Sequence, residues 1–140
     1  MSRPPRIPNW LPWEKSTIYF ITFCVEARKP ILANARAWKI CRAVFDKLDQ
    51  WRILSAIAMP DHLHVLAAPA DRDASVSDFA KWFKRCSTRR IASRIVGRLC
   101  QTATQLSEKR QYLRQNPIRA GLVADPDDWP YQFQFNENEL

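Results

Sequence analysis

Residues 53–68 read ILSAIAMPDHLHVLAA and form the centre of the predicted fold. Two apolar runs, 53–59 and 62–68, are separated only by Pro60 and Asp61. Two such runs joined by two turn-forming residues are typical of a β-hairpin, because so short a connection permits only antiparallel pairing. The stretch therefore predicts two neighbouring antiparallel strands.

The flanking sequence supplies the other predicted elements. The β-branched and aromatic run TIYFITFCV at 17–25 predicts a strand, and helical spacing of apolar residues predicts helices over 35–51 and from Ser75 to about Val96. Gly97 is expected to end the second of these helices, and 98–105 has only weak strand character.

A third, basic helix is expected over 106–115, interrupted or ended near Asn116 because Pro117 lacks an N–H, with Gly121 as the final stop. The order strand–helix–strand–strand–helix, with a doubtful fourth strand and this appended helix, predicts an α+β ferredoxin-like sandwich with an antiparallel sheet.

Length and composition favour one folded domain. The chain has 140 residues, of which 46% are hydrophobic, and these include six Trp and seven Phe. That content excludes intrinsic disorder, and no apolar run is long enough to span a bilayer. The N-terminus lacks the apolar segment of a secretory signal, and the four cysteines show no metal or disulfide spacing. A cytoplasmic protein with no membrane association is expected.

Charge is concentrated in the second half of the chain. The net charge is +8, and 11 of the 22 basic residues lie between Lys81 and Arg119, with Glu108 as the one acid of that segment. A basic surface attracts polyanions and releases counterions on contact with phosphates. Nucleic acid is therefore the favoured class of partner, although a basic helix face that only aids solubility remains an alternative.

Both histidines of the chain, His62 and His64, lie two residues apart in the second strand of the hairpin. Side chains alternate between the faces of a strand, so both imidazoles are expected on one face. Neutral imidazole binds Mn, Zn, Fe or Cu, and it can help to hold Mg when oxygen ligands complete the shell. The pair is a candidate metal site, and two histidines that merely end a strand beside a helix are the alternative.

Tyr112 and Asn116 lie four residues apart on the third predicted helix and are expected to share a face. The Asn116 amide oxygen is a possible metal ligand, and a tyrosine hydroxyl beside a cation can attack phosphorus. A divalent ion acts as a Lewis acid on a phosphodiester. The alternative is that Tyr112 only packs against the sheet.

Three segments together resemble a known family: MPDHLHVL at 59–66, YLRQNPIRAGLV at 112–123 and DDWPY at 127–131. The chain resembles the single-tyrosine HUH transposases, most closely the REP-associated tyrosine transposases, over about residues 5–131. The resemblance implies that His62 and His64 are the HUH ligands of a divalent metal, Mg or Mn. It also implies that Asn116 is a third ligand candidate and that Tyr112 is the nucleophile.

The same resemblance implies nicking and strand transfer of single-stranded DNA beside a hairpin, through a 5′-phosphotyrosine intermediate with release of a 3′-OH. It divides the chain into an extended basic, Pro-rich arm (1–16), a transposase-like domain (17–124) and a C-terminal tail (125–140). Contacts with the DNA are expected from the arm and from the basic helices. These residues are Arg3, Arg6, Lys81, Lys84, Arg85, Arg89, Arg90, Arg114 and Arg119.

One departure from the family concerns the segment before the tyrosine helix. Family members usually carry a longer, aromatic segment there, whereas this chain has only 97–105. A lost strand would expose a sheet edge and displace Tyr112, which would impair the enzyme. A non-catalytic nucleic-acid-binding module of ferredoxin-like fold is the alternative function, and monomer and homodimer are both open.

Overall fold

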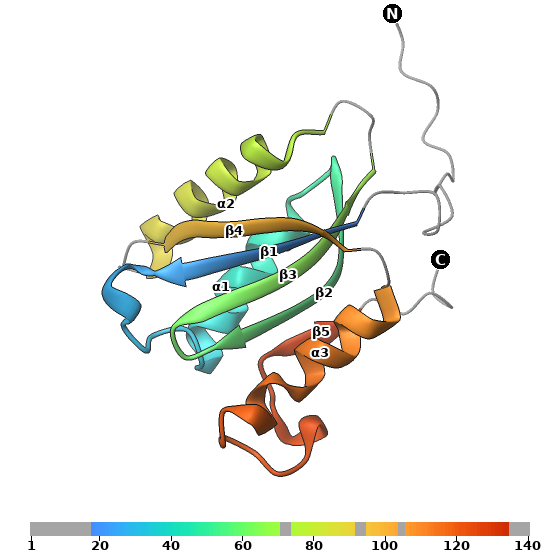
Figure 1. Ribbon diagram of the computed structural model, residues 1–140. Helices are drawn as coiled ribbons and strands as arrows, with labels where there is room; N and C mark the ends of the chain where they lie inside the picture. Colours follow the sequence, from blue (N-terminus) through green and yellow to red (C-terminus); the bar gives the residue numbers. More distant parts are fainter. Residues whose placement is uncertain (1–17, 71–73, 92–94, 104–105, 135–140) are drawn as a thin grey trace, which may run out of the picture.

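The structure is a computed structural model, and it describes residues 18–70, 74–91, 95–103 and 106–134. It contains a five-stranded antiparallel sheet of order β4-β1-β3-β2-β5 (Figure 1). The strands are β1 (Ile18–Val25), β2 (Trp51–Met59), β3 (His62–Pro69), β4 (Ile95–Ala103) and β5 (Gln132–Gln134). Both halves of the predicted hairpin are confirmed, because β2 and β3 pair with Met59 opposite His62.

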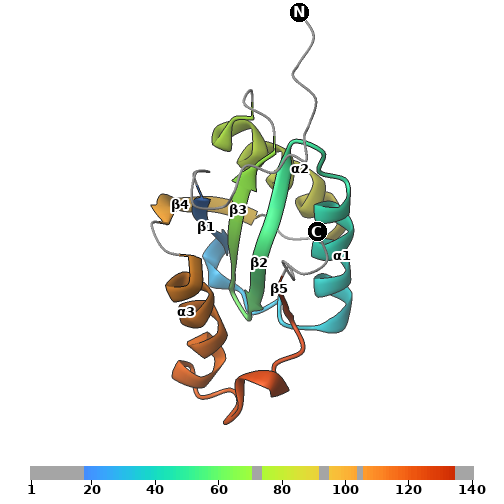
Figure 2. The ribbon, with the colours of Figure 1, turned by 90° about the vertical axis from the view of Figure 1, so that its right-hand side faces the viewer.

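Helices cover both faces of the sheet (Figure 2). On one face, α1 (Ala35–Asp46) and α2 (Val76–Ile91) bury Val44, Phe45 and Phe83 against β1, β2 and β3. On the other face, α3 (Leu106–Arg119) contributes Leu113 to a second core. The predicted α+β architecture with an appended helix is therefore confirmed, and the sheet separates α2 from α3.

Local sequence explains where the first two helices begin. The side chain of Asn34 accepts a hydrogen bond from the Ala37 backbone N–H at 2.9 Å. Ser75 caps α2 in the same way, with its hydroxyl 3.2 Å from the Asp78 backbone nitrogen. A side-chain acceptor satisfies an N–H that has no partner inside the first turn. Helix α1 is shorter than predicted, because it ends at Asp46 and Trp51 already belongs to β2.

The fourth strand, in doubt from the sequence, is present. Strand β4 spans nine residues and pairs antiparallel with β1 along its length, from Ile95 opposite Val25 to Ala103 opposite Ile18. The prediction that Gly97 ends a helix is wrong, because α2 ends at Ile91 and Gly97 lies in β4 opposite Phe23. The register shifts at this point of β1, and glycine is typical of such an irregularity.

Helix α3 runs further than predicted. It continues through Pro117 to Arg119 and is neither interrupted nor ended near Asn116. The helix then ends as Gly121 predicts: Gly121, at φ +75°, donates its N–H to Ile118, and Leu122 donates to Pro117. This pair of bonds satisfies the last carbonyls of the helix, and the positive φ favours glycine.

The segment after α3 folds back onto the sheet instead of forming a tail over its described part, up to residue 134. Strand β5 pairs with β2, with Phe133 opposite Ala56. Trp129 is buried and donates its indole N–H to the Ala58 carbonyl at 3.0 Å. This segment therefore completes the core between α3 and the sheet. None of the described helices is long and apolar enough to cross a membrane.

Candidate active site

The two histidines lie together on one face of β3, as alternation along a strand predicts. Their ring centroids are 4.7 Å apart, with an angle of 73° between the rings. The next residues on the same face, Leu66 and Ala68, belong to the core that includes Leu113 of α3. The histidine pair therefore lies on the side of the sheet that the tyrosine helix covers.

Each imidazole is held through its Nδ1 atom. Nδ1 of His64 lies 2.9 Å from Oγ1 of Thr22, directly opposite on β1. Nδ1 of His62 lies 2.7 Å from Oδ1 of Asp61. Among the described contacts, the Nε2 atoms are thus the nitrogens left for a ligand, and partners of this kind fix the tautomer that a metal needs.

Burial keeps His64 in its neutral form. Removal from water, with smaller contributions from the charges of His62 and Arg119, lowers the pKa of His64 to about 3. Only the neutral imidazole has a lone pair to offer a metal ion. His64 is therefore competent as a ligand throughout the physiological pH range.

A carboxylate and an arginine lie behind His62. Partial burial by itself would raise the pKa of Asp61, but hydrogen bonds and charges from Arg28 and His62 outweigh it and hold that pKa below its usual value. Nε of Arg28 lies 2.8 Å from Oδ2 of Asp61. The Asp61 side chain is therefore an anion that engages a different partner with each oxygen.

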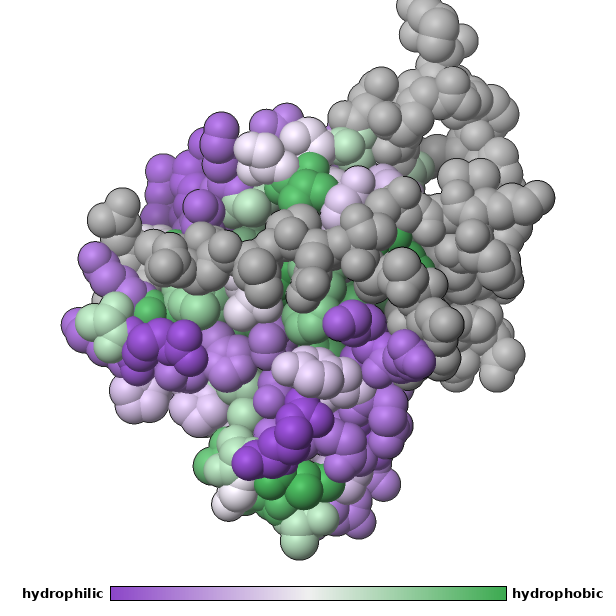
Figure 3. Space-filling model, in the orientation of Figure 1, coloured by the Kyte–Doolittle hydropathy of each residue, from purple (hydrophilic) through white to green (hydrophobic). Residues whose placement is uncertain are grey.

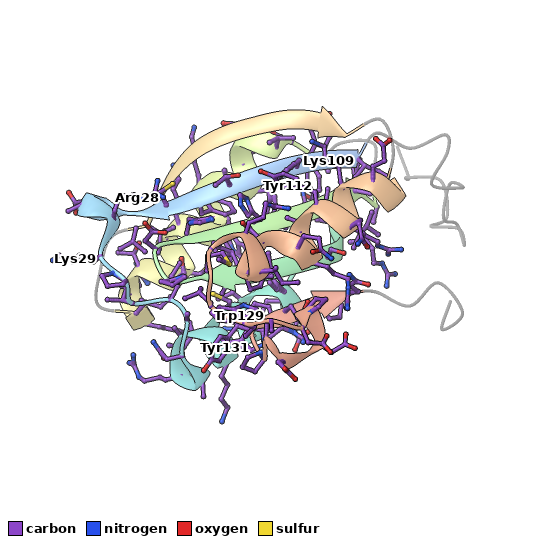
Figure 4. All side chains as sticks on the ribbon, turned by 60° about the horizontal axis from the view of Figure 1, so that its bottom comes forward. Arg28, Lys29, Lys109, Tyr112, Trp129 and Tyr131 are labelled. Atoms are coloured by element: carbon purple, nitrogen blue, oxygen red, sulfur yellow. The ribbon has the colours of Figure 1, made fainter. Side chains whose placement is uncertain are left out.

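Tyr112 and His64 share a neighbour, Phe20 of β1. The Phe20 ring centroid is 5.1 Å from His64 and 6.1 Å from Tyr112, with edge-on geometry in both cases. Tyr112 is 47% exposed, although its neighbour Leu113 is buried. Figure 4 shows Tyr112 on the side of α3 toward β1, away from Trp129 and Tyr131. A half-exposed phenol on this face of the sheet is accessible to a polymeric substrate.

Two cations flank the tyrosine. The Arg119 guanidinium carbon lies 4.2 Å from the centre of the Tyr112 ring, and Nζ of Lys109 lies 5.6 Å from it. Arg119 also donates to the Tyr112 carbonyl at 2.8 Å. Cations placed beside a nucleophile attract a phosphodiester and stabilise the charge that develops on it.

The other two tyrosines do not occupy equivalent positions. Tyr19 packs against the core on the α1 and α2 face, 5.7 Å from Trp51 in ring centroids. Tyr131 packs against Trp129, with centroids 5.4 Å apart. Within the described part of the chain, Tyr112 is therefore the tyrosine whose ring shares a neighbour with His64.

Asn116, expected as a further metal ligand, has an unpartnered amide. It follows Tyr112 by one turn of α3, and its amide nitrogen is buried without a hydrogen-bond partner among the described residues. An unpartnered buried amide carries a desolvation cost that a ligand would remove, and a half-turn of the amide exchanges its nitrogen and oxygen. The described residues contain no group of three His, Cys, Asp or Glu side chains that could hold a metal ion.

The basic residues expected to touch DNA fall on two sides of the sheet. Lys81, Lys84, Arg85, Arg89 and Arg90 belong to α2, whereas Arg114 and Arg119 belong to α3. Figure 3 shows hydrophilic residues over the outer surface of α2 and over much of α3. Arg114 pairs with Asp127 at 2.5 Å. Arg3 and Arg6 lie outside the described residues.

Sequence reasoning missed the residues that support the histidines: Thr22, Phe20, Asp61 and Arg28. Asp61 precedes His62 in the hairpin turn, and that adjacency was a usable signal. Thr22 and Phe20 carry no signal of their own, because their role follows from the β1–β3 register. Arg28 lies 33 positions from Asp61, so only the folded chain brings them together.

Comparison with protein families identifies the chain. Residues 14–111 match the model of the family described as "Transposase IS200 like", which is well over half of the sequence. The chain belongs to the IS200-like transposase family. The match covers the histidine pair and ends one residue before Tyr112. The family match of this transposase therefore does not extend to Tyr112.

Two solved structures resemble this IS200-like transposase in fold. A REP-associated tyrosine transposase bound to a REP hairpin superposes with a TM-score of 0.69 at 17% identity, covering 89% of this chain and 81% of the other. A putative transposase from Deinococcus radiodurans R1 gives a TM-score of 0.55 at 18% identity, covering 89% and 100%. No curated protein matches the sequence significantly. The fold is thus that of a REP-associated tyrosine transposase.

Proposed function

We propose that this protein is a transposase of the REP-associated type that nicks and joins single-stranded DNA beside a hairpin, with Tyr112 as its nucleophile. The observation that carries the proposal is that one ring, Phe20 of β1, contacts both Tyr112 and His64. The candidate nucleophile on α3 and the candidate metal ligands on β3 therefore lie on the same side of the sheet. This is the constellation that attack on a phosphodiester requires.

In the forward step, the Tyr112 hydroxyl oxygen loses its proton and bonds to the scissile phosphorus. The bond from phosphorus to the 3′ oxygen of the preceding nucleotide breaks, leaving a 5′-phosphotyrosine and a free 3′-OH. A 3′-OH can later attack the phosphotyrosine and regenerate Tyr112. Because one phosphate ester replaces another, rejoining needs no nucleotide cofactor.

His62 and His64, with Asn116 as a third candidate, would hold a divalent cation, Mg or Mn. When bound, the cation polarises the scissile phosphate as a Lewis acid. Thr22 and Asp61 hold the imidazole rings through Nδ1, which leaves Nε2 free. Lys109 and Arg119, beside the Tyr112 ring, attract the phosphate backbone to the nucleophile.

The proposed DNA contacts follow from the two basic surfaces. Arg119 and Lys109 on α3 would bind the single strand that enters the site, with Arg114 beside them. Lys81, Lys84, Arg85, Arg89 and Arg90 on α2 would contact a different part of the DNA, because the sheet lies between α2 and α3. The hairpin carried by the REP-associated relative supports a hairpin as the substrate class.

A covalent-adduct assay tests the proposal. The chain is incubated with hairpin DNA that has a single-stranded extension, with Mn²⁺ or Mg²⁺, and adducts are resolved on a denaturing gel. We expect an adduct that disappears in Tyr112→Phe and persists in the control Tyr131→Phe, with hairpin binding almost unchanged in both variants. If the wild-type chain binds the hairpin but forms no adduct with either metal, the non-catalytic binding module is the correct function.

A further inference from the structure

The loop after β1 has an unusual backbone next to the histidine hairpin. Ala27 and Arg28 both have positive φ, at 59° and 54°, in the short 3₁₀ turn Glu26–Arg28. Residues with a Cβ seldom adopt this conformation, and two in succession need support from the surrounding structure. Strained backbone of this kind clusters at functional sites.

Two backbone hydrogen bonds attach this loop to the turn between β2 and β3. The Val25 N–H donates to the Asp61 carbonyl at 3.0 Å, and the Leu32 N–H donates to the Pro60 carbonyl at 2.9 Å. The loop is therefore fastened on both sides of the left-handed pair, directly against the turn that leads into His62.

The left-handed pair directs the Arg28 side chain at Asp61. Nε of Arg28 donates to Oδ2 of Asp61 at 2.8 Å, while Nη1 lies 3.6 Å from Sγ of Cys24. The other carboxylate oxygen, Oδ1, lies 2.7 Å from Nδ1 of His62. Each oxygen of the carboxylate has its own partner, so rotation of the carboxylate would break a contact. Figure 4 shows Arg28 at the end of β1, next to Lys29.

We propose that Arg28 is a positioning residue for the metal-binding histidines: through Asp61 it fixes the orientation and tautomer of the His62 ring. The inference rests on the proposed metal-binding function of His62 and His64. A carboxylate behind a ligating imidazole orients the ring and raises its basicity, and its removal typically lowers metal affinity by about 10- to 100-fold. Arg28 acts one contact further out, so its effect is expected to be smaller.

Exposure indicates that this role is one of positioning rather than stability. The Arg28 side chain is 60% exposed and that of Asp61 is 27% exposed. An ion pair so open to water contributes little to folding. Arg28 and His62 already engage the two oxygens of Asp61. Asp61 is thus better suited to support His62 than to bind the ion directly.

The test measures Mn²⁺ binding to the DNA-free protein, either by calorimetry or from the electron paramagnetic resonance signal of free Mn²⁺. We expect Asp61→Asn to weaken binding by at least about tenfold and Arg28→Gln by about threefold to tenfold. Arg28→Lys should recover part of the loss. Lys29→Gln, which removes the same charge one residue later, should bind like the wild-type chain, and the urea midpoints of all variants should agree.

A double variant identifies the route. Adding Arg28→Gln to Asp61→Asn should cause almost no further loss, because Arg28 acts through that carboxylate. The proposal is overturned if Arg28→Gln binds Mn²⁺ like the wild-type chain, if the two losses multiply, or if Lys29→Gln loses as much. The variant His62→Ala distinguishes failure of the proposed metal site from failure of the role of Arg28. If His62→Ala binds Mn²⁺ as the wild-type chain does, or if the wild-type chain binds none, the metal site itself is wrong. The proposed role of Arg28 is then wrong as well.

Discussion

Thr22 lies directly opposite His64 in the β1–β3 ladder, with its hydroxyl oxygen 2.9 Å from Nδ1 of the imidazole. For Nε2 to keep its lone pair for a metal, Nδ1 must carry the proton and donate it to this hydroxyl. The Nδ1 partners of the two histidines differ in charge. His64 contacts a neutral hydroxyl, whereas His62 contacts a carboxylate that is itself paired with an arginine.

Replacing Thr22 by valine should weaken metal binding. Valine keeps the shape of the side chain but leaves Nδ1 of His64 without an acceptor, so the tautomer is no longer fixed. We expect about a tenfold loss of Mn²⁺ affinity by calorimetry, in the range for partners of ligating histidines. Thr22→Ser, which keeps the hydroxyl, should retain most of the affinity. Equal losses in both variants would mean that packing, and not the hydrogen bond, supports His64.

The metal-free protein should lose stability as the pH falls below about 6.5. The pKa of His64 is about 3 in the folded chain, through burial and the charges of His62 and Arg119, and 6.5 is its ordinary value. Between these values the unfolded chain binds a proton that the folded chain does not. Acid therefore favours unfolding, by up to about 1.4 kcal/mol per pH unit.

Urea unfolding in EDTA between pH 7.5 and 4.5 measures this effect. His64→Gln cannot titrate, so its free energy of unfolding should fall less steeply with pH than that of the wild-type chain. Parallel curves would show that His64 does not remain neutral in the folded state.

DNA affinity should depend on the two basic helices in different ways. For a hairpin with a single-stranded extension, Arg85→Gln and Arg119→Gln should each lower affinity and reduce the salt slope by up to about one ion. For the isolated extension, Arg119→Gln should still matter, whereas Arg85→Gln should have little effect, because the sheet separates α2 from Tyr112. Fluorescence anisotropy across a salt series checks this. An equal effect of Arg85→Gln on both ligands would contradict it.

Ala27→Gly should stabilise the protein or leave its stability unchanged. Glycine has no Cβ to strain at φ 59°, although its freedom in the unfolded chain offsets part of the gain. We expect a free energy of unfolding that rises by up to about 1 kcal/mol in urea titrations. At an ordinary negative φ the same substitution would lower it, so a clear loss of stability would show that the turn is not left-handed at residue 27.

Local pattern was a good guide where one segment contains the whole signal. The hairpin and the shared face of His62 and His64 follow from alternation along a strand, and the end of α3 follows from the positive φ that Gly121 can adopt. Local sequence pattern was a poor guide where partners outside a segment determine its structure. The sequence of β4 is a weak strand former and contains Gly97, but the strand forms because it pairs with β1 along its length.

The sequence by itself determined the α+β class, the paired histidines and the helix that carries Tyr112, because periodicity and turn residues act over a few positions. Only the tertiary structure decided that Tyr112 and His64 share Phe20, that Thr22 and Arg28 support the histidines, and that α2 and α3 lie on opposite faces. Those relationships depend on strand register and on which core each helix joins. Both are set by packing between residues far apart in the chain, which no local pattern records.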